Sequence, residues 1–255
     1  MGKVIRDLKV IENKEIKPGF FVITVNTGNP VPKIYPGQFL QILVNGSSET
    51  FLRRPISVYD FDKSSGVLKM LIQIVGAGTS RLSMLKRGDT VNAVFPLGNT
   101  FTLPGANEKV LLVGGGVGIA PLLFLGRAVL ESGGIPEFLL GFRNNATVLD
   151  IKEFEKLGKV WLTTEDGSEG VKGYVTAHPA LASGKHTRIY CCGPDPMMKA
   201  VAAIAEATGA ECEVSLEHLM ACGFGVCLCC VVATTSGNLC TCTDGPIFNT
   251  KALKW

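Results

Sequence analysis

Short runs of alternating apolar and polar residues, many of them β-branched, recur along the first hundred positions of the chain. They predict strands over residues 20–25, 39–44, 56–59, 67–75 and 90–94. One short helix is expected over residues 80–85. Several short strands at this spacing, separated by turn-forming residues, are typical of a barrel or a sandwich. We therefore expect residues 1–103 to form an antiparallel β-barrel.

The pattern changes after residue 104, where apolar runs alternate with segments of helical periodicity. Buried strands are expected over residues 110–113, 138–141, 160–163 and 188–192. Helices are expected over residues 118–131, 149–157 and 197–208. This alternation predicts a Rossmann-like parallel sheet with helices on both faces, over residues 104–212.

Residues 213–255, which we call the cysteine segment, are too few to build a core of their own. A metal centre would supply the missing organisation. The predicted fold class is therefore an α+β multidomain protein: a β-barrel, an α/β domain and a small metal-binding segment.

Composition narrows the setting in which the chain works. Its 255 residues are 46% hydrophobic and 18% charged with a net charge of +3, which favours compact domains and gives no reason to expect nucleic acid or an anionic membrane as a partner. No apolar run reaches the roughly 18 residues of a membrane span, and the N-terminus lacks the apolar core of a signal peptide. Nine cysteines without an export signal predict a cytoplasmic protein with reduced, metal-binding thiols.

Six of the nine cysteines lie between positions 222 and 242. Cys222, Cys227 and Cys230 form a C-x4-C-x2-C array, which is the ligand spacing of a [2Fe–2S] cluster. Cys240 and Cys242 compete for the place of fourth ligand. The glycines between the first two cysteines would let this loop curl and offer amide donors to sulfur.

Other metal sites fit the same segment less well. A four-cysteine zinc site usually has two C-x2-C pairs, and here only Cys227 and Cys230 form one. In an extended strand Cys227 and Cys229 would share a face while Cys230 pointed away, so the proposed set requires a curled loop. His218 could join a Rieske-type site only with a second histidine, and we expect it to be an ordinary packing or surface residue.

Two motifs lie at strand ends of the predicted α/β domain. The run from Gly114 to Pro121 (Gly-Gly-Gly-Val-Gly-Ile-Ala-Pro) follows a buried strand and opens a helix, where glycines let the backbone approach a phosphate. The alternative is a tight glycine turn without a ligand, since Pro121 replaces the last glycine of the usual pattern. Cys192, Gly193 and Pro194 end another strand and would line the same edge of the sheet; taken alone, this cysteine is a buried apolar residue.

Two further motifs lie in the predicted barrel. Arg54-Pro55-Ile56-Ser57 can hold a diphosphate or a flavin edge through charge-assisted bonds and a hydroxyl. Gly76-Ala77-Gly78-Thr79 precedes the short helix and could accept a second phosphate. Each is weak alone, because an Arg pair such as Arg53-Arg54 usually marks a solvated strand edge.

The order of these motifs resembles the ferredoxin-reductase superfamily, in which a flavin-binding β-barrel precedes a nicotinamide-binding α/β domain. The stretches Met220-Ala221-Cys222-Gly223 and Cys242-Thr243-Asp244-Gly245-Pro246 resemble one branch more closely, the electron-transfer subunit of NAD-dependent (type B) dihydroorotate dehydrogenase. So does Thr164-Glu165-Asp166-Gly167-Ser168. The resemblance spans essentially the whole chain.

The resemblance implies three cofactors, FAD, NAD and a [2Fe–2S] cluster, and assigns residues to each. FAD would be held by Arg54, Pro55, Ile56, Ser57, Leu71, Ile72, Gln73, Gly78 and Thr79. NAD would be held by Gly114, Gly115, Gly116, Gly118, Pro121, Cys192, Gly193 and Pro194, with Glu217 near the nicotinamide. The cluster ligands would be Cys222, Cys227, Cys230 and Cys242, the last because it stands two positions before Asp-Gly-Pro.

The resemblance also implies an electron route, from cluster to FAD to NAD+, because flavin exchanges electrons both singly and in pairs. We expect no room in the chain for a second flavin or a substrate-binding (β/α)8 domain. The expected partner is therefore the FMN-containing catalytic subunit that oxidises dihydroorotate in pyrimidine biosynthesis, in a heterotetramer with two copies of each chain.

Three alternatives stay open: a subunit of an NAD(P)H–ferredoxin or sulfide-dehydrogenase type reductase, a zinc-stapled regulatory flavin module, and an oxygen-reactive NADH oxidase. The choice of NAD over NADP also stays open, since Arg143 after the second strand of the α/β domain would tolerate a 2′-phosphate.

Overall fold

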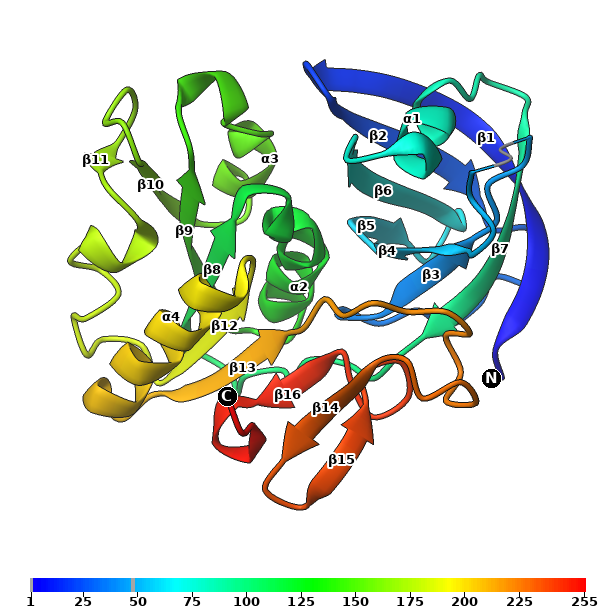
Figure 1. The fold of residues 1–255 in the computed structure, drawn as a ribbon. Coiled ribbons are helices and arrows are strands. Elements are labelled where there is room, and N and C mark those ends of the chain that lie inside the picture. The colour runs from blue at the N-terminus through cyan, green and yellow to red at the C-terminus, as the bar shows by residue number, and fades with distance from the viewer. Residues whose placement is uncertain (1, 47–48) are drawn as a thin grey trace.

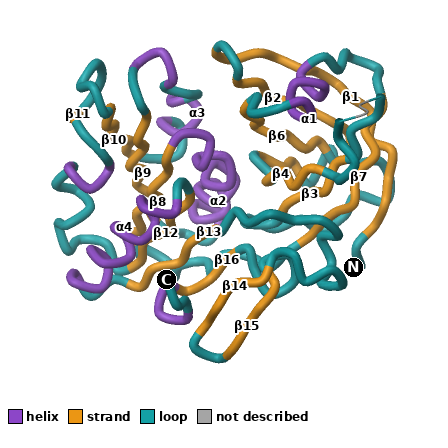
Figure 2. The backbone as a smooth tube through the Cα atoms, viewed as in Figure 1, coloured by secondary structure: helices purple, strands orange, loops and turns teal. Residues whose placement is uncertain are grey.

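The computed structural model describes residues 2–46 and 49–255 (Figure 1). It contains two seven-stranded sheets and a two-stranded hairpin. Figure 2 shows the two sheets side by side, with the end of the chain running beneath both. The molecule thus has the two expected domains and a third segment that touches each of them.

The N-terminal sheet is antiparallel, with strand order β4-β3-β7-β1-β2-β6-β5. Its strands are β1 (Val4–Lys17), β2 (Phe20–Asn26), β3 (Phe39–Ile42), β4 (Arg54–Ser57), β5 (Asp60–Asp62), β6 (Val67–Gln73) and β7 (Thr90–Leu97), with helix α1 (Ala77–Ser83) between the last two. The sheet is a half-barrel, because its edge strands β4 and β5 do not pair with each other in the described chain. The predicted antiparallel architecture is confirmed, and the sheet takes the form of a half-barrel.

Two strands of this sheet were not predicted. In β1 only Leu8 and Val10 are buried, and charged residues fill most of the exposed positions, so the strand has no apolar run. Strand β5 is only three residues long. The short helix begins three residues earlier than expected, where the Thr79 hydroxyl accepts a hydrogen bond of 2.9 Å from the Val75 N–H.

Strand β3 has two differently used faces. Leu40 and Ile42 belong to the interior core of the half-barrel. Phe39 packs instead with three residues of the cysteine segment, Cys230, Cys240 and Cys242. Because side chains alternate along a strand, Gln41 shares the outer face with Phe39.

The second sheet has strand order β11-β10-β9-β8-β12-β13-β16. Its strands are β8 (Lys109–Gly115), β9 (Ile135–Phe142), β10 (Lys159–Thr164), β11 (Val171–Lys172), β12 (Arg188–Cys192), β13 (Glu211–Ser215) and β16 (Ile247–Asn249). All pairs are parallel except β13 with β16, so the sheet is mostly parallel. Strand β13 runs across the expected domain boundary after residue 212, and β16 comes from the cysteine segment.

Helices cover both faces of this sheet, as predicted. Residues of α2 (Ala120–Glu131) and α3 (Ile151–Glu155) pack on one face, and residues of α4 (Asp195–Thr208) pack on the other. Short 3-10 turns complete the chain: η1 (Gly116–Ile119), η2 (Asn145–Thr147), η3 (Val175–Ala177) and η4 (Thr250–Ala252).

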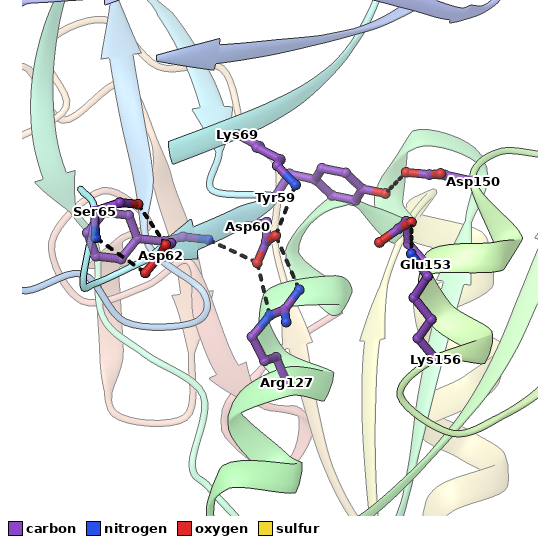
Figure 3. Close-up of polar contacts among 10 residues, drawn as sticks. Tyr59, Asp60, Asp62, Ser65, Lys69, Arg127, Asp150, Glu153 and Lys156 are labelled. Carbon is purple, nitrogen blue, oxygen red and sulfur yellow. Dashed lines mark hydrogen bonds and ion pairs between the residues drawn. The ribbon is translucent and has the colours of Figure 1, made fainter. Parts of the chain in front are cut away.

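Polar contacts join the half-barrel to helices α2 and α3 (Figure 3). Asp60 lies between Arg127 of α2, at 3.2 Å, and Lys69 of β6, at 3.4 Å. The neighbouring Tyr59 hydroxyl donates to the carboxylate of Asp150 at the start of α3. The core between the domains is continuous as well, since Tyr59 and Leu71 of the half-barrel pack in one cluster with residues of α2.

The cysteine segment is anchored to both domains. Its hairpin, β14 (Val231–Thr234) and β15 (Gly237–Cys240), stands outside both sheets. Strand β16 completes the α/β sheet. Asn99 of the half-barrel binds the turn before β16: its amide donates to the Asp244 and Ile247 carbonyls at 2.7 and 2.8 Å and accepts from the Ile247 N–H at 2.9 Å. The segment's small core is therefore shared, with half-barrel residues on one side and cysteines on the other.

Candidate cofactor sites

The glycine run after β8 is packed too closely for side chains. A Cβ on Gly115 would lie 2.6 Å from the Met197 sulfur, and one on Gly118 would lie 2.6 Å from the Cys192 carbonyl oxygen. Gly116 has a φ of +56°, and nothing lies within 4 Å of the Cβ position it lacks, so its backbone faces open space. The run thus combines a tightly packed base with one exposed backbone surface.

The Cys192-Gly193-Pro194 motif lies against this glycine run. Strand β12 pairs with β8, with Cys192 opposite Gly114, so both motifs stand at the carboxyl ends of adjacent parallel strands. The chain runs outward from β8 through β9 and β10 and then returns to the other side of β8, which makes this edge the topological switch point where α/β sheets bind ligands. The structure therefore brings together the two motifs that the sequence singled out separately.

Cys192 is a buried lining residue of this edge and not a reactive thiol. It is fully buried, and burial raises its pKa well above the usual value, with the nearby negative charge of Glu217 adding to the effect. Pro121 stands in the first turn of α2, where a missing N–H costs nothing, which explains a proline at the position of the usual glycine.

The residues predicted for the flavin converge on one end of the half-barrel. Arg54 of β4 lies over the start of α1, since a Cβ on Gly78 would be 2.9 Å from its Nε atom. The Thr79 hydroxyl is tied into the preceding turn by the Val75 and Gly76 N–H groups at 2.9 and 3.3 Å. Arg53, by contrast, points back into the sheet, where its guanidinium binds the Asn92 side chain at 2.6 Å. The two adjacent arginines therefore have different environments.

Strand β6 contributes main chain more than side chains. Leu71 and Ile72 are buried in two different cores, and only Gln73 is partly exposed. The ladder between β5 and β6 stops at Lys69, so no strand covers that edge of residues 71–73. Pro55 is exposed, and Ile56 and Ser57 are half-buried on the neighbouring β4.

The cysteine loop is curled, as the predicted ligand set requires. No strand covers residues 216–230, and Leu228 adopts a left-handed φ of +55° between Cys227 and Cys229. All nine cysteines are free thiols. Cys230 and Cys242 are buried, Cys222 is half-buried, and Cys227 is exposed.

The thiols of the predicted set lie near one another in two pairs. Cys222 Sγ accepts a hydrogen bond from the Phe224 N–H at 3.4 Å, and the Cys227 thiol and the N–H groups of Val226 and Cys227 lie close enough to favour its thiolate. Slight burial opposes ionisation, but these donors outweigh it and lower the pKa of Cys222. The second pair is Cys230 and Cys242: burial and the neighbouring Cys230 thiol raise the pKa of Cys242.

Cys240 and Cys242 remain close competitors in space. Both lie near the Cys230 thiol, but Cys242 also lies near the Gly225 N–H of the loop, which favours its thiolate. The backbone of Cys240 is instead held in the turn, because the Cys240 N–H donates a hydrogen bond of 2.8 Å to the Asp244 carboxylate.

The donor set fits a two-iron cluster. Within residues 2–46 and 49–255 no three Cys, His, Asp or Glu side chains are grouped tightly enough to hold a single metal ion. A [2Fe–2S] cluster takes two thiolates on each iron, so its four ligands need not converge on one point. One pair lies on the cysteine loop and the other joins the end of that loop to the turn after β15, and with backbone N–H donors to sulfur the two neighbouring pairs satisfy that requirement.

Neither Cys229 nor His218 joins these pairs through a described contact. Cys229 is exposed and His218 is half-buried. The other histidines, His178 and His186, lie beside Trp161 in the α/β domain. Cys191 and Cys212 are buried structural residues, as their strand positions predict.

Two family models match the chain in agreement with this geometry. Residues 217–254 match the iron-sulfur cluster binding domain of dihydroorotate dehydrogenase B, and residues 112–203 match an oxidoreductase NAD-binding domain. A dihydroorotate dehydrogenase B (NAD(+)) electron transfer subunit from Caldanaerobacter subterraneus subsp. tengcongensis is 39% identical over 94% of both chains. One from Shouchella clausii is 41% identical over 84% of both.

The chain belongs to this family of electron transfer subunits. It is therefore part of an oxidoreductase, the NAD-dependent dihydroorotate dehydrogenase B, with an iron–sulfur binding segment and a ferredoxin-reductase-like fold. The family implies a catalytic partner subunit. In the described chain no helix is long and apolar enough to cross a membrane.

Solved structures agree on the fold. One from an NADH-dependent reduced ferredoxin–NADP oxidoreductase, studied for flavin-based electron bifurcation, has a TM-score of 0.88 at 31% identity and covers 97% of this chain and 90% of its own. The ferredoxin reductase of carbazole 1,9a-dioxygenase has a TM-score of 0.71 at 21% identity, over 82% and 67% of the two chains. The second likeness concerns the fold alone.

Proposed function

We propose that this chain passes electrons from the FMN of a dihydroorotate dehydrogenase catalytic subunit, through a [2Fe–2S] cluster and FAD, to NAD+. The observation that carries the proposal is the two neighbouring thiol pairs, formed by the cysteine loop and the turn after β15 and packed directly against the half-barrel. Flavin supplies the exchange between single electrons and a hydride. The chain's own residues bind and orient the groups and exclude water.

In the half-barrel, Arg54 and Ser57 would hold the flavin from β4, with Gly78 and Thr79 at its diphosphate. The proximity of Arg54 to Gly78 supports this assignment, because one guanidinium can then reach a diphosphate lying on the turn before α1. The uncovered edge of residues 71–73 offers main-chain donors and acceptors to the flavin ring. Pro55 and Ile56 complete that wall.

In the α/β domain, Gly114, Gly115, Gly116 and Gly118 would let the NAD pyrophosphate approach the start of α2. The open backbone at Gly116 supports this role. Cys192, Gly193 and Pro194 would line the nicotinamide pocket, since they stand at the next strand end. A thiol that stays protonated, as Cys192 does, presents an uncharged surface to the nicotinamide.

In the cysteine segment, each thiol pair would bind one iron: Cys222 with Cys227 on the loop, and Cys230 with Cys242 of the turn after β15. We prefer Cys242 over Cys240 because it also contacts the loop through the Gly225 N–H. The Phe224 N–H at 3.4 Å from Cys222 Sγ is a donor of the kind that raises cluster potentials.

The surface around this loop supports docking of the FMN-containing subunit. Leu219, Phe224, Val226 and Leu228 are exposed large apolar residues, from 48% for Phe224 to 85% for Leu219. Four such side chains on one loop beside the thiols favour a protein partner over solvent. Two chains of each kind would assemble as a heterotetramer.

A substitution in the loop tests the route. Cys227→Ala should abolish electron transfer between the partner and NAD+, while NADH oxidation by added dyes, which take electrons from FAD, is largely spared. Cys229→Ala is the matched control, because this second exposed cysteine lies two positions away and outside the proposed set. Equal loss of both activities in Cys227→Ala would contradict the proposal, as would equal effects of the two variants.

A second candidate is a reductase subunit that works with ferredoxin, favoured by the likeness to the NADH-dependent reduced ferredoxin–NADP oxidoreductase. The chain purified without air together with its native partners separates the two. A copurified FMN protein that oxidises dihydroorotate supports our proposal, and a ferredoxin-binding partner without that activity supports the second. Stoichiometric zinc in place of iron and sulfide would exclude both.

A further inference from the structure

Gln41 is a buried amide without a partner. It lies on the outer face of β3, its exposed fraction is 0%, and neither Oε1 nor Nε2 makes a hydrogen bond with any residue that the structure describes. An unpaired buried amide destabilises a fold, because it loses its hydrogen bonds with water and gains none. Such a residue needs an explanation, and its surroundings point to one.

The side chain of Gln41 is aimed at the cysteine loop. A Cβ on Gly223 would lie 2.8 Å from Gln41 Cγ and 3.2 Å from its Nε2, so the loop backbone rests directly on this side chain. Gly223 immediately follows Cys222, a proposed ligand. Glycine with a φ of +80° permits that close approach, and any larger residue would push the loop away.

Apolar side chains of the half-barrel lie beside Gln41, and the Arg53 guanidinium binds Gln41 only at its main-chain carbonyl, at 3.2 Å. Phe39 and Leu97 pack there against Cys230 and Cys242, the second proposed thiol pair. The Gln41 amide lies under Gly223, next to Cys222, and therefore faces the cysteine loop and any group bound to that loop. Sulfur atoms of a bound cluster accept hydrogen bonds from amides, and such bonds stabilise its more negative, reduced form.

We propose that Gln41 is a positioning residue whose Nε2 donates a hydrogen bond to a sulfur of the bound cluster, either the Cys222 thiolate or an adjacent inorganic sulfide. This inference rests on the proposed iron–sulfur function. The amide is unpaired in the cluster-free chain and paired in the loaded one. It therefore raises the reduction potential of the cluster and favours cluster binding.

The test uses the complete chain with its native partner and compares Gln41→Met with Gln38→Met. Methionine keeps the length of the side chain and removes the amide. Gln38 is the matched control, because its amide is already paired inside the half-barrel, with Gly98 O at 3.1 Å and the Tyr35 N–H at 2.9 Å. The first readout is the unfolding temperature of the chain without the cluster. The second is the midpoint reduction potential of the bound cluster, measured through its electron paramagnetic resonance signal.

We expect cluster-free Gln41→Met to unfold at the same temperature as the unmodified chain or higher, and its cluster to have a lower midpoint potential with the FAD potential unchanged. Gln38→Met should unfold at a lower temperature with its cluster potential unchanged. Reduced iron content in Gln41→Met, with unaltered cluster-free stability, also supports the proposal. Gln41→Glu, which keeps the shape but adds negative charge, should lower the potential or the iron content further.

Three results would overturn the inference. The first is an unchanged cluster potential in Gln41→Met at full iron content, and the second is an equal shift in Gln38→Met. The third is a loss of cluster-free stability in Gln41→Met, which would mean that the amide has a partner within the protein. If the unmodified chain itself gives no iron–sulfur signal, the proposed function fails, and that result is distinct from all three.

Discussion

Asn99→Ala should release the cysteine segment from the half-barrel. The Asn99 side chain makes three hydrogen bonds to main-chain groups of Asp244 and Ile247, at 2.7, 2.8 and 2.9 Å. A net contribution of about 0.7–1 kcal/mol per bond, within the usual range for a partly exposed site, gives roughly 2–3 kcal/mol for the three. Alanine keeps the strand end but removes all three bonds.

The effect should concentrate on local opening of the segment. Asn99 anchors the 244–247 turn, which directly follows Cys242. Local opening of this turn therefore exposes the cluster to a chelator before the domains unfold. A loss of 2–3 kcal/mol raises the open population by roughly 30- to 150-fold. The rate at which an iron chelator bleaches the visible cluster absorption measures this population. Asn238→Ala, at an exposed position of strand β15 in the same segment, should leave that rate unchanged.

The reasoning fails if Asn99→Ala loses its cluster at the rate of the unmodified chain. It also fails if the flavin and the cluster are released together, because Asn99 would then stabilise the whole fold and not the segment.

Two more predictions concern the nucleotide-binding loop and acid stability. Gly118→Ala places a Cβ 2.6 Å from a carbonyl oxygen, which should lower the free energy of unfolding by about 1–3 kcal/mol and weaken NADH binding. Gly116→Ala has open space at its Cβ, so its unfolding should show only the roughly 1 kcal/mol penalty of a left-handed φ. Equal losses of unfolding free energy in the two variants would refute the packing argument. The pKa of Glu108 is lowered by hydrogen bonds from the Thr187 hydroxyl and the Gly105 N–H and by the Arg188 charge. The Glu108 carboxylate therefore stabilises the fold at pH values above its unfolded-state pKa of about 4.3. That contribution is lost as the pH falls through the lower pKa of the folded state. Glu108→Gln should therefore unfold at lower urea than the unmodified chain at pH 7 and close to it at about pH 3, and an equal gap at both pH values would contradict this sign.

Elements defined by local pattern could be predicted from the sequence. The strand over residues 188–192 and the glycine run after β8 were recognisable because apolar runs and glycines carry their own signal. Strand β1 was not recognisable, because its charged outer face hides the alternation. Strand β16 was missed for a different reason: three residues form a strand only when β13 lies beside them.

The candidate sites also contain some residues that the sequence pattern predicts and others that it does not. The C-x4-C-x2-C spacing predicts three thiols and the resemblance implies Cys242 as the fourth, and the structure places Cys242 near Cys230. The spacing cannot predict Asn99 or Gln41, since each is a lone amide whose contact lies more than a hundred residues away along the chain. Residues that hold a site through long-range contacts leave no local pattern, even when the site itself does.

Strand β3 connects the two halves of the proposed electron route. Its outer face supplies Phe39 and Gln41 to the floor of the cysteine loop, and its ladder pairs the same two residues with Ser57 and Pro55 of the flavin motif. Neighbouring strands are about 4.8 Å apart, and their register is fixed by the buried residues Leu40 and Ile42 on the opposite face. The position of the thiols relative to the flavin strand is therefore set by one hydrogen-bonded ladder and not by a flexible linker. A shift of β3 by one residue would exchange its two faces, disrupting the half-barrel core and the floor of the cysteine loop at once.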